Sequence, residues 1–139
     1  MTVIRSSLQL ETQGNCDVID ISGQLADLVG GGDINDGVAV VFCQSSTSAL
    51  TTIEYEPGCI EDLKQFFETI LPSDASYQHN LRWGDGNGYS HLRAALLGAS
   101  LTIPFESHRL TLGTWQQVVL VDFDNRPRKR ELVVQLIGD

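Results

Sequence analysis

The chain has 139 residues, 42% of them apolar and 19% charged, which suits one folded domain spanning residues 1–139. Acidic residues outnumber basic residues by 18 to 9, and the net charge of −9 argues against a nucleic-acid or anionic-membrane partner because either would be repelled. No apolar run is long enough to span a membrane, no secretory signal opens the chain, and the three cysteines form no CxxC pair. We therefore expect a soluble, cytoplasmic protein with reduced thiols.

In chain order, apolar spacing predicts strands at 2–11, 38–43 and 49–55 and helices at 22–28 and 57–71, while 17–22 fits either a strand or a helix start. Pro57 lies where the second helix begins, a position at which its missing N–H costs little. Glu56, directly before it, is expected to cap that helix.

The second half opens with a polar segment, 73–90, whose length and composition predict an ordered functional loop. Ser90 is placed to cap a short helix that Gly98 ends. The apolar stripe of this helix is predicted to consist of Leu92, Ala95 and Leu96. Strand patterns follow at 101–105, 114–123 and 131–137. Two to three helices with about six strands, mostly in hairpin order, predict a single-domain α+β fold with mostly antiparallel, sandwich-like sheets.

The stretch GDGNGYSH at 84–91 is the most chemically suggestive part of the sequence. A cap at Ser90 would put His91 in the first helical turn, where the helix dipole disfavours a protonated imidazole. His79 lies twelve residues upstream, and Asp85 falls between the two histidines. Two imidazoles and a carboxylate can hold Zn²⁺ or another divalent ion with an open coordination position. The alternative is that both histidines face solvent or cap the core.

The glycines of this stretch suit a different ligand, because they let the backbone approach closely and expose amide donors for an anion. The amides of Gly86 and Gly88, with Arg93, would then hold a phosphate. The stretch is not a phosphate loop of the GxxxxGK[ST] type, and it lacks the carboxylate ladder of a calcium loop.

Three other segments offer polar side chains. Glu54 follows apolar and hydroxyl residues, so we expect a buried acid with a raised pKa that suits proton transfer. Gln116 shares a strand face with Thr114 and could line a polar pocket. The arginines of DFDNRPRKR could clamp an anion, although a solvated hairpin tip is the more common meaning of such a run.

Five segments together resemble the YjbQ-like family over roughly residues 38–139: TTIEYEPG, YQHN with GDGNGYSHLRA, LLGASLTIPF, LTLGTWQQVVLVDFD and RPRKRELVVQLIGD. The resemblance implies a compact α+β homotrimer with a pocket near a subunit interface and a low-level thiamine-phosphate synthase activity, which joins a pyrimidine pyrophosphate to a thiazole phosphate. It implies that several members bind a metal through histidines. By position, the implied pocket residues are His79, Asp85, Asn87 and His91, with Thr47, Glu54 and Gln116 nearby.

The sequence departs from that family pattern at two positions. Ser46 stands where the better-known branch has a histidine, so a three-histidine zinc site lacks one ligand and a two-histidine site completed by Asp, Glu or water stays open. His108 replaces an expected glycine before LTLGTWQ, which either alters the turn or adds a ligand.

Two functions follow as hypotheses. In the first, the protein is an enzyme of the thiamine-phosphate synthase type: Glu54, Asp85 and His91 are catalytic, a divalent ion (Zn²⁺ or Mg²⁺) is bound by His79 and His91, and Thr47, Gly86, Asn87, Gly88, Arg93 and Gln116 bind a small phosphorylated molecule. In the second, the protein is a non-catalytic homotrimer that binds a small anion or a metal.

Overall fold

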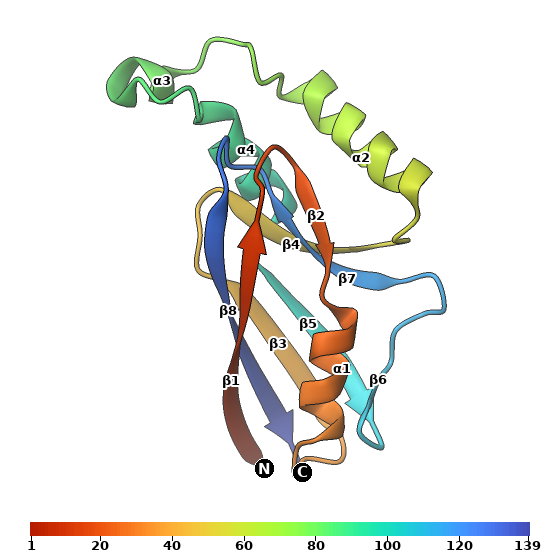
Figure 1. Ribbon diagram of the computed structural model, residues 1–139. Coiled ribbons are helices and arrows are strands. Elements are labelled where there is room, and N and C mark those ends of the chain that lie inside the picture. Colours follow the sequence, from red (N-terminus) through yellow and green to blue (C-terminus); the bar gives the residue numbers. More distant parts are fainter.

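The computed structural model describes residues 1–139 as eight strands and four helices (Figure 1). In chain order these are β1 (Thr2–Thr12), β2 (Asp17–Asp20), α1 (Ser22–Gly30), β3 (Gly37–Cys43), β4 (Ser48–Ile53), α2 (Pro57–Ile70), α3 (Gln78–Trp83), α4 (Gly88–Leu97), β5 (Ser100–Glu106), β6 (Arg109–Leu110), β7 (Gln117–Asp122) and β8 (Arg128–Gly138). The predicted α+β class is confirmed.

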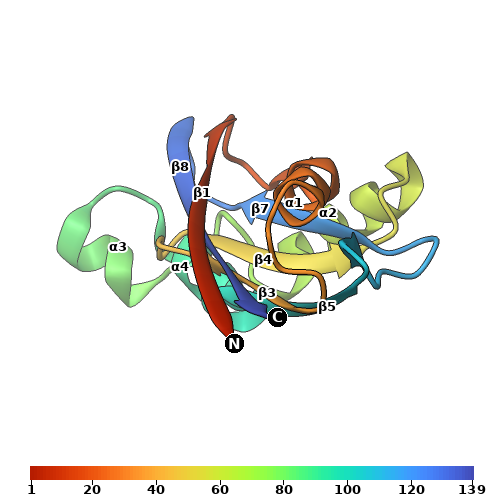
Figure 2. The ribbon, with the colours of Figure 1, turned by 90° about the horizontal axis from the view of Figure 1, so that it is seen from below.

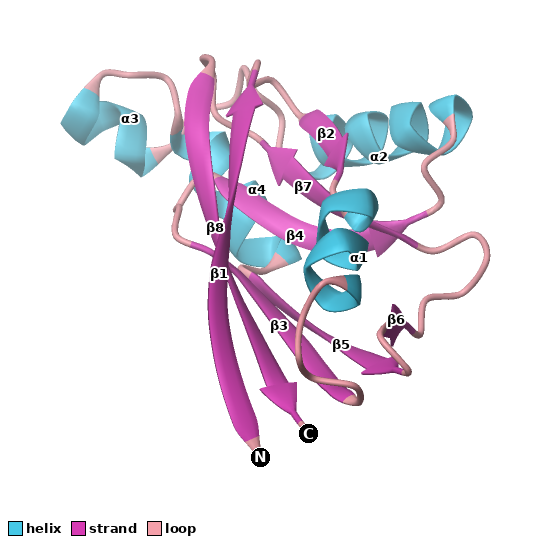
Figure 3. Cartoon of the chain, turned by 60° about the horizontal axis from the view of Figure 1, so that its bottom comes forward, coloured by secondary structure: helices cyan, strands magenta, loops and turns pink.

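The strands form two antiparallel sheets. The larger sheet has the order β1-β8-β3-β5-β6, and β1 pairs with β8 along its whole length, from Thr2 opposite Gly138 to Thr12 opposite Arg128. The smaller sheet has the order β2-β7-β4. The larger sheet curls around α1, which lies on its concave side (Figures 2 and 3).

The smaller sheet is buried on both faces, and this accounts for the alternating pattern of β7. Val118 and Leu120 join the main core, which α1 and the larger sheet also form. Val119 and Val121 face the other way, into a second core with α2 and α4, where Phe67 packs edge-on against Phe123 with ring centroids 4.7 Å apart. The alternation therefore reports two apolar layers rather than one apolar and one solvated face.

Helix α2 begins and ends as predicted. Its N-cap is Glu56, whose carboxylate accepts hydrogen bonds from the backbone N–H groups of Gly58 and Cys59, both at 2.8 Å. These bonds lower the pKa of Glu56. The segment at 17–22, which fitted two structures, begins as the strand β2.

Three sequence-based expectations are wrong in detail. The polar segment 73–90, predicted as a loop, contains the short helix α3. The sequence pattern did not indicate this helix because the few apolar residues of the segment form no periodic stripe. Strand β7 begins at Gln117 rather than 114, because Gly113 and Gln116 close a turn through a backbone hydrogen bond of 3.0 Å. The stripe predicted for α4 faces outward: Leu92 and Leu96 are 48% and 61% exposed.

No helix of the structure is both long and apolar enough to cross a bilayer.

Candidate functional site

Helices α3 and α4 bring the two predicted histidines together. Helix α3 ends at Gly84, which adopts a left-handed conformation with φ of 64°, and the chain reverses before α4 begins at Gly88. His79 on α3 and His91 on α4 then face one another, with ring centroids 4.3 Å apart and ring planes inclined by 39°. The turn at 84–87 thus places the two imidazole rings next to each other.

Close packing at this turn requires a glycine at one position. A Cβ atom on Gly88 would lie 2.6 Å from the Cβ atom of Tyr77 and 3.0 Å from Oδ1 of Asn80. The amide of Gly88 donates to that same Asn80 oxygen at 2.9 Å. Gly88 therefore locks α3 onto α4 and has no free amide for a phosphate, whereas Gly86, with φ of 65°, opens to free space.

The histidine pair carries a carboxylate neighbour. Oδ1 of Asp85 lies 3.4 Å from Nδ1 of His79. Burial lowers the pKa of His91, and the adjacent His79 lowers it further, while Asp85, Asp124 and a backbone hydrogen bond with Ser46 raise it by less. The net effect favours a neutral imidazole at His91, as predicted, but for a different reason. The predicted cap at Ser90 is wrong, because α4 begins at Gly88 with Asn87 as its N-cap, and burial is the dominant cause of the shift.

A cavity of about 360 Å³ opens beside His91. It is lined by Ser45, Ser46, Ser48, His91, Ala94, Ala95, Gly98 and Ala99, and we call it the histidine pocket. Its floor is the junction of three segments, where Cys43 N–H donates to Ala99 O and Leu50 N–H donates to Gly98 O. Small residues on α4 leave room there, and serine hydroxyls from the β3–β4 connection supply its polarity.

Asn87 ties the histidine turn to the β7–β8 turn. Its side-chain oxygen accepts from Ser90 Oγ and, at 3.2 Å, from the backbone N–H of Asn125. Asn125 Nδ2 donates in turn to the backbone oxygen of Asp85 at 2.8 Å. Asn87 is 4% exposed, and its hydrogen bonds stabilise the turn at 84–87.

Behind the pocket lies a buried set of charges that we call the Asp–Arg network: Asp122, Asp124, Arg128 and Arg130. Arg130 donates from Nε to Asp122 Oδ2 at 2.7 Å and from Nη2 to Asp122 Oδ1 at 3.0 Å. Arg128 donates from Nε to Asp124 Oδ2 at 3.0 Å. Arg128 and Arg130 are therefore not free to clamp an anion, whereas the tip at 125–127 is exposed, as expected for a solvated hairpin tip.

Thr47 links this network to the pocket, next to Ser46 in the chain. Its hydroxyl donates to Asp124 Oδ2 at 2.9 Å and accepts from Arg130 Nη2 at 2.8 Å. Burial works to raise the pKa of Asp124, but hydrogen bonds from Thr47 and Arg128 prevail and hold that pKa below its usual value. Asp124 is 1% exposed, and its Oδ1 accepts no hydrogen bond within the chain. Sequence reasoning missed Asp124, whose only signal was its place after a buried strand.

Glu54 and Gln116 lie away from the histidines within the subunit. Strand β4 starts at Ser48, beside the histidine pocket, and runs its full length before Glu54, which is exposed. Gln116 lies at that same distant end, where its Nε2 donates to Thr52 Oγ1 at 3.2 Å. The expected burial of Glu54 is wrong, because the strand has left the core before it reaches that residue.

Arg93 does not reach the glycine turn. Its guanidinium donates from Nε and Nη2 to Leu71 O at 3.0 and 2.7 Å, and from Nη2 to Glu68 at 2.8 Å. Two positions after His91, it lies on the face of α4 that packs toward α2. The phosphate grip predicted from Gly86, Gly88 and Arg93 is therefore not assembled in the subunit.

His108 belongs to a turn and adds no ligand to the pair. Ser107 and His108 both have left-handed backbone conformations, with φ of 50° and 58°, between β5 and β6. That conformation explains why a glycine is expected at this position. The turn lies at the far end of β5 from Ala99, which lines the pocket.

As a metal site, the donor set is incomplete in one chain. No three His, Cys, Asp or Glu side chains come close enough together to hold a metal ion. His79 and His91 could supply two ligands, and Ser46, not an imidazole, stands beside His91 in the pocket wall. A catalytic zinc ion takes three protein ligands, so the residues present fit an ion only if water or substrate oxygens complete its coordination.

The geometry defines a class: a single-domain α+β protein with two antiparallel sheets, a pair of histidines from adjacent short helices, and a pocket that one of them, His91, lines. The family model described as "UPF0047 protein YjbQ-like" matches residues 6–139, and the chain belongs to that family.

Relatives and solved structures agree with the assignment. A UPF0047 protein of Archaeoglobus fulgidus is 37% identical over 130 residues, which cover 94% of this chain and 98% of that protein. The UPF0047 protein YugU of Bacillus subtilis is 30% identical over 134 residues, covering 95% and 98%. The crystal structure of a YbjQ-like protein of unknown function from Sulfolobus solfataricus has a TM-score of 0.93 and 30% identity over 99% of both chains. A hypothetical protein from Aeropyrum pernix has a TM-score of 0.90 at 29% identity, covering 98% of this chain and 99% of that one.

Proposed function

We propose that the histidine pocket binds a small phosphorylated molecule and supports a low-level transfer of the thiamine-phosphate synthase type. In that reaction, the bond between the pyrimidine methylene carbon and the pyrophosphate oxygen breaks. The thiazole nitrogen forms the new bond to that carbon, and pyrophosphate leaves with the electron pair. The observation that carries the proposal is the pairing of His79 with His91, whose ring centroids are 4.3 Å apart, beside a cavity that His91 lines together with three serines.

The residues of the pocket suit a leaving group that gains negative charge. Serine hydroxyls at 45, 46 and 48 and the open turn at Gly86 offer hydrogen-bond donors to phosphate oxygens. Burial lowers the pKa of His91 and favours the neutral imidazole, in which one ring nitrogen carries a proton. The second ring nitrogen is then an acceptor for a proton or a ligand for an ion.

A divalent ion, Zn²⁺ or Mg²⁺, would be held by His79 and His91 and would offset the charge of pyrophosphate as it departs. A homotrimer with this pocket near a subunit interface belongs to the same proposal. Such an assembly could bring exposed residues of one subunit, Glu54 and Gln116 included, close to the histidines of another.

The test is an assay of the purified protein with both thiamine precursors and Mg²⁺, in which thiamine phosphate is quantified by mass spectrometry. His91→Ala should abolish product formation, and His108→Ala, at the far end of β5, should leave it unchanged. Turnover that persists in His91→Ala at the rate of the unsubstituted protein would refute the assignment of the site.

A non-catalytic binding role is the second candidate. The observation in its favour is that no lysine or arginine lines the histidine pocket, whereas pyrophosphate chemistry relies on cations. Stabilisation by phosphate compounds in a thermal-shift assay, lost in His91→Ala and accompanied by no product, would favour the binding role over the enzyme.

A further inference from the structure

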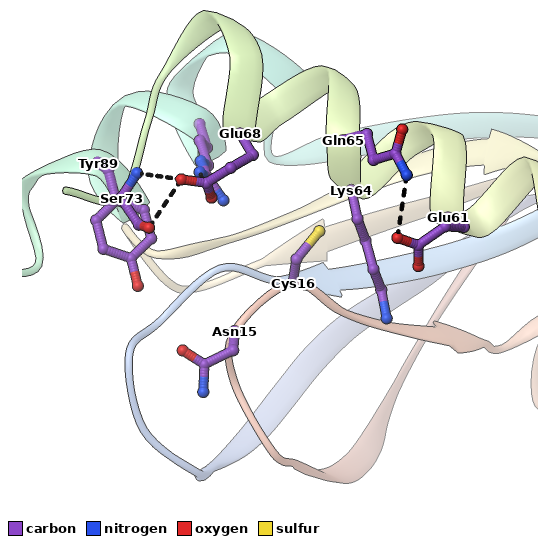
Figure 4. Close-up of a pocket in the computed structure, with 9 residues that line it drawn as sticks. Asn15, Cys16, Glu61, Lys64, Gln65, Glu68, Ser73 and Tyr89 are labelled. Atoms are coloured by element: carbon purple, nitrogen blue, oxygen red, sulfur yellow. Dashed lines mark hydrogen bonds and ion pairs between the residues drawn. The ribbon is translucent and has the colours of Figure 1, made fainter. Parts of the chain in front are cut away.

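A second cavity, of about 320 Å³, lies on the opposite side of α4 from the histidine pocket, between α2 and the turn that joins β1 to β2 (Figure 4). Helix α2 contributes Lys64 and Glu68, α4 contributes Tyr89 and Arg93, and the turn contributes Cys16. We call it the α2 cavity. It shares no lining residue with the histidine pocket.

The deep end of the α2 cavity carries donors that have no acceptor in the chain. Arg93 is 3% exposed and binds Leu71 and Glu68 through Nε and Nη2, which leaves Nη1 without a partner. Its guanidinium carbon lies 4.7 Å from the ring centre of Tyr89. Tyr89 is 5% exposed, and its hydroxyl makes no hydrogen bond within the chain. Figure 4 shows this hydroxyl directed into the cavity.

The charges around the cavity leave one cation, Lys64, and one anion, Glu61, without an ion pair. Glu68 is fully engaged, because it accepts from Arg93 and from both the N–H and the hydroxyl of Ser73 at 2.8 Å. These bonds lower the pKa of Glu68 to about 2. Lys64 forms no ion pair, and Figure 4 shows its side chain extending from α2 past Cys16, on the side away from Tyr89, toward the strand that follows Cys16. Glu61 is exposed at the mouth, where it accepts from Gln65.

The floor of the cavity is neutral and held in a strained conformation. Asn15 and Cys16 have left-handed backbone conformations, with φ of 55° and 62°. Such residues cluster where a surface is shaped for binding. Burial raises the pKa of the Cys16 thiol to about 11; Arg93 and Lys64 lower it, while Asp17 and Glu61 raise it. The sulfur is therefore a protonated, apolar wall on which both cations act.

We propose that the α2 cavity is a second ligand site, which takes a small oxyanion: the carboxylate or phosphate group of a small molecule. The ligand would accept hydrogen bonds from Nη1 of Arg93 and the hydroxyl of Tyr89 at the inner end and pair with Lys64 nearer the mouth. This proposal does not rest on the proposed function, since the two cavities are separate.

The experiment titrates the ¹⁵N-labelled protein with inorganic phosphate and, separately, with malonate, with chloride as the ionic-strength control. Binding should shift the amides of Asn15, Cys16 and Ser73 and saturate for at least one of the two anions. Tyr89→Phe, which keeps the ring stacked on Arg93, should weaken binding about tenfold, the value of a hydrogen bond to a charged group. Shifts confined to residues of the histidine pocket, or equal for chloride, would overturn the proposal.

Charge variants fix the sign of the ligand. Lys64→Gln should weaken binding severalfold, and the matched control Lys129→Gln, which removes the only other lysine, should leave it unchanged. Glu61→Gln should tighten binding, because it removes an exposed negative charge at the mouth. Weaker binding in Glu61→Gln, or unchanged binding in Lys64→Gln, would show that the cavity does not hold an anion.

Discussion

The Asp–Arg network predicts a large loss of stability when Arg130 is replaced by Met. The side chain of Arg130 is 13% exposed and that of Asp122 is 0% exposed, so the charges are shielded from solvent. Methionine matches the length of the arginine stem but leaves Asp122 with hydrogen bonds only from Thr12 Oγ1 and the Asp124 backbone. It also removes the donor to Thr47.

Loss of one partner from a buried ion pair costs about 3–5 kcal/mol, because the remaining charge stays desolvated and uncompensated. For a domain of this size, each kcal/mol shifts the melting temperature by roughly 3–4 °C, which gives a decrease of roughly 10–20 °C. The loss should be greatest near neutral pH and should shrink as the pH approaches 4, since protonation of the stranded carboxylates removes the uncompensated charge.

Chemical denaturation followed by circular dichroism measures the effect. The matched control is Arg126→Met, in the same turn, because Arg126 is exposed and its side chain makes no hydrogen bond or ion pair in the chain. We expect that control to stay within about 0.5 kcal/mol of the unsubstituted protein. If Arg130→Met were no more destabilising than Arg126→Met, the network would contribute no net stability and the reasoning would be wrong.

Three further predictions concern the histidine turn. The pKa of His91 is lowered from 6.5 in the folded chain, so the unfolded chain takes up a proton at higher pH than the folded chain does. The free energy of unfolding should therefore fall as the pH drops below about 6.5. In denaturation curves at several pH values, His91→Asn should flatten this pH dependence, and an unchanged pH dependence would contradict the prediction. Gly88→Ala should cost more stability than Gly86→Ala by calorimetry, because an added Cβ meets Tyr77 at 2.6 Å in the first case and nothing within 4 Å in the second, where only the left-handed backbone opposes it at about 1 kcal/mol. Zn²⁺ should raise the melting temperature of the unsubstituted protein but not of His79→Ala, with His108→Ala as the control; equal shifts in all three would remove the histidine pair as an ion site.

The fold could be predicted wherever the pattern had one explanation. Alternation over β1 identifies the strand and its more buried face, and helical spacing identifies α2, although Phe67 alone of its residues is buried and Phe66 and Ile70 are exposed. Helix α4 shows the limit. Two faces of this helix could be buried, and in the structure the buried face is the one with Tyr89, Arg93 and Ala94. On that face the guanidinium of Arg93 donates hydrogen bonds to Glu68 and to the backbone oxygen of Leu71. A buried arginine cannot be predicted from local periodicity.

The site could be predicted only in part, for a similar reason. The sequence suggested that His79 and His91 form a pair but did not show how the chain brings them together. Helix α3 ends at Gly84, and the chain reversal there places the two rings next to each other. Glu54 and Gln116 were grouped with the histidines through family resemblance, yet in the subunit they lie beyond the other end of β4. Within a single chain, the length of β4 separates Glu54 and Gln116 from the histidines with which the family resemblance had grouped them.

The β7–β8 turn gives the two cavities a common support. The backbone oxygen of Asp124 accepts from the N–H of Asn15 at 2.7 Å, which fixes the strained turn beneath the α2 cavity. The side chain of Asp124 accepts from Thr47, beside the histidine pocket. Asp124 therefore contacts a residue that lines the α2 cavity, Asn15, and a residue next to the lining of the histidine pocket, Thr47. Arg128 and Arg130 are therefore held against buried carboxylates, although Arg128 is still 33% exposed and Arg130 is 13% exposed.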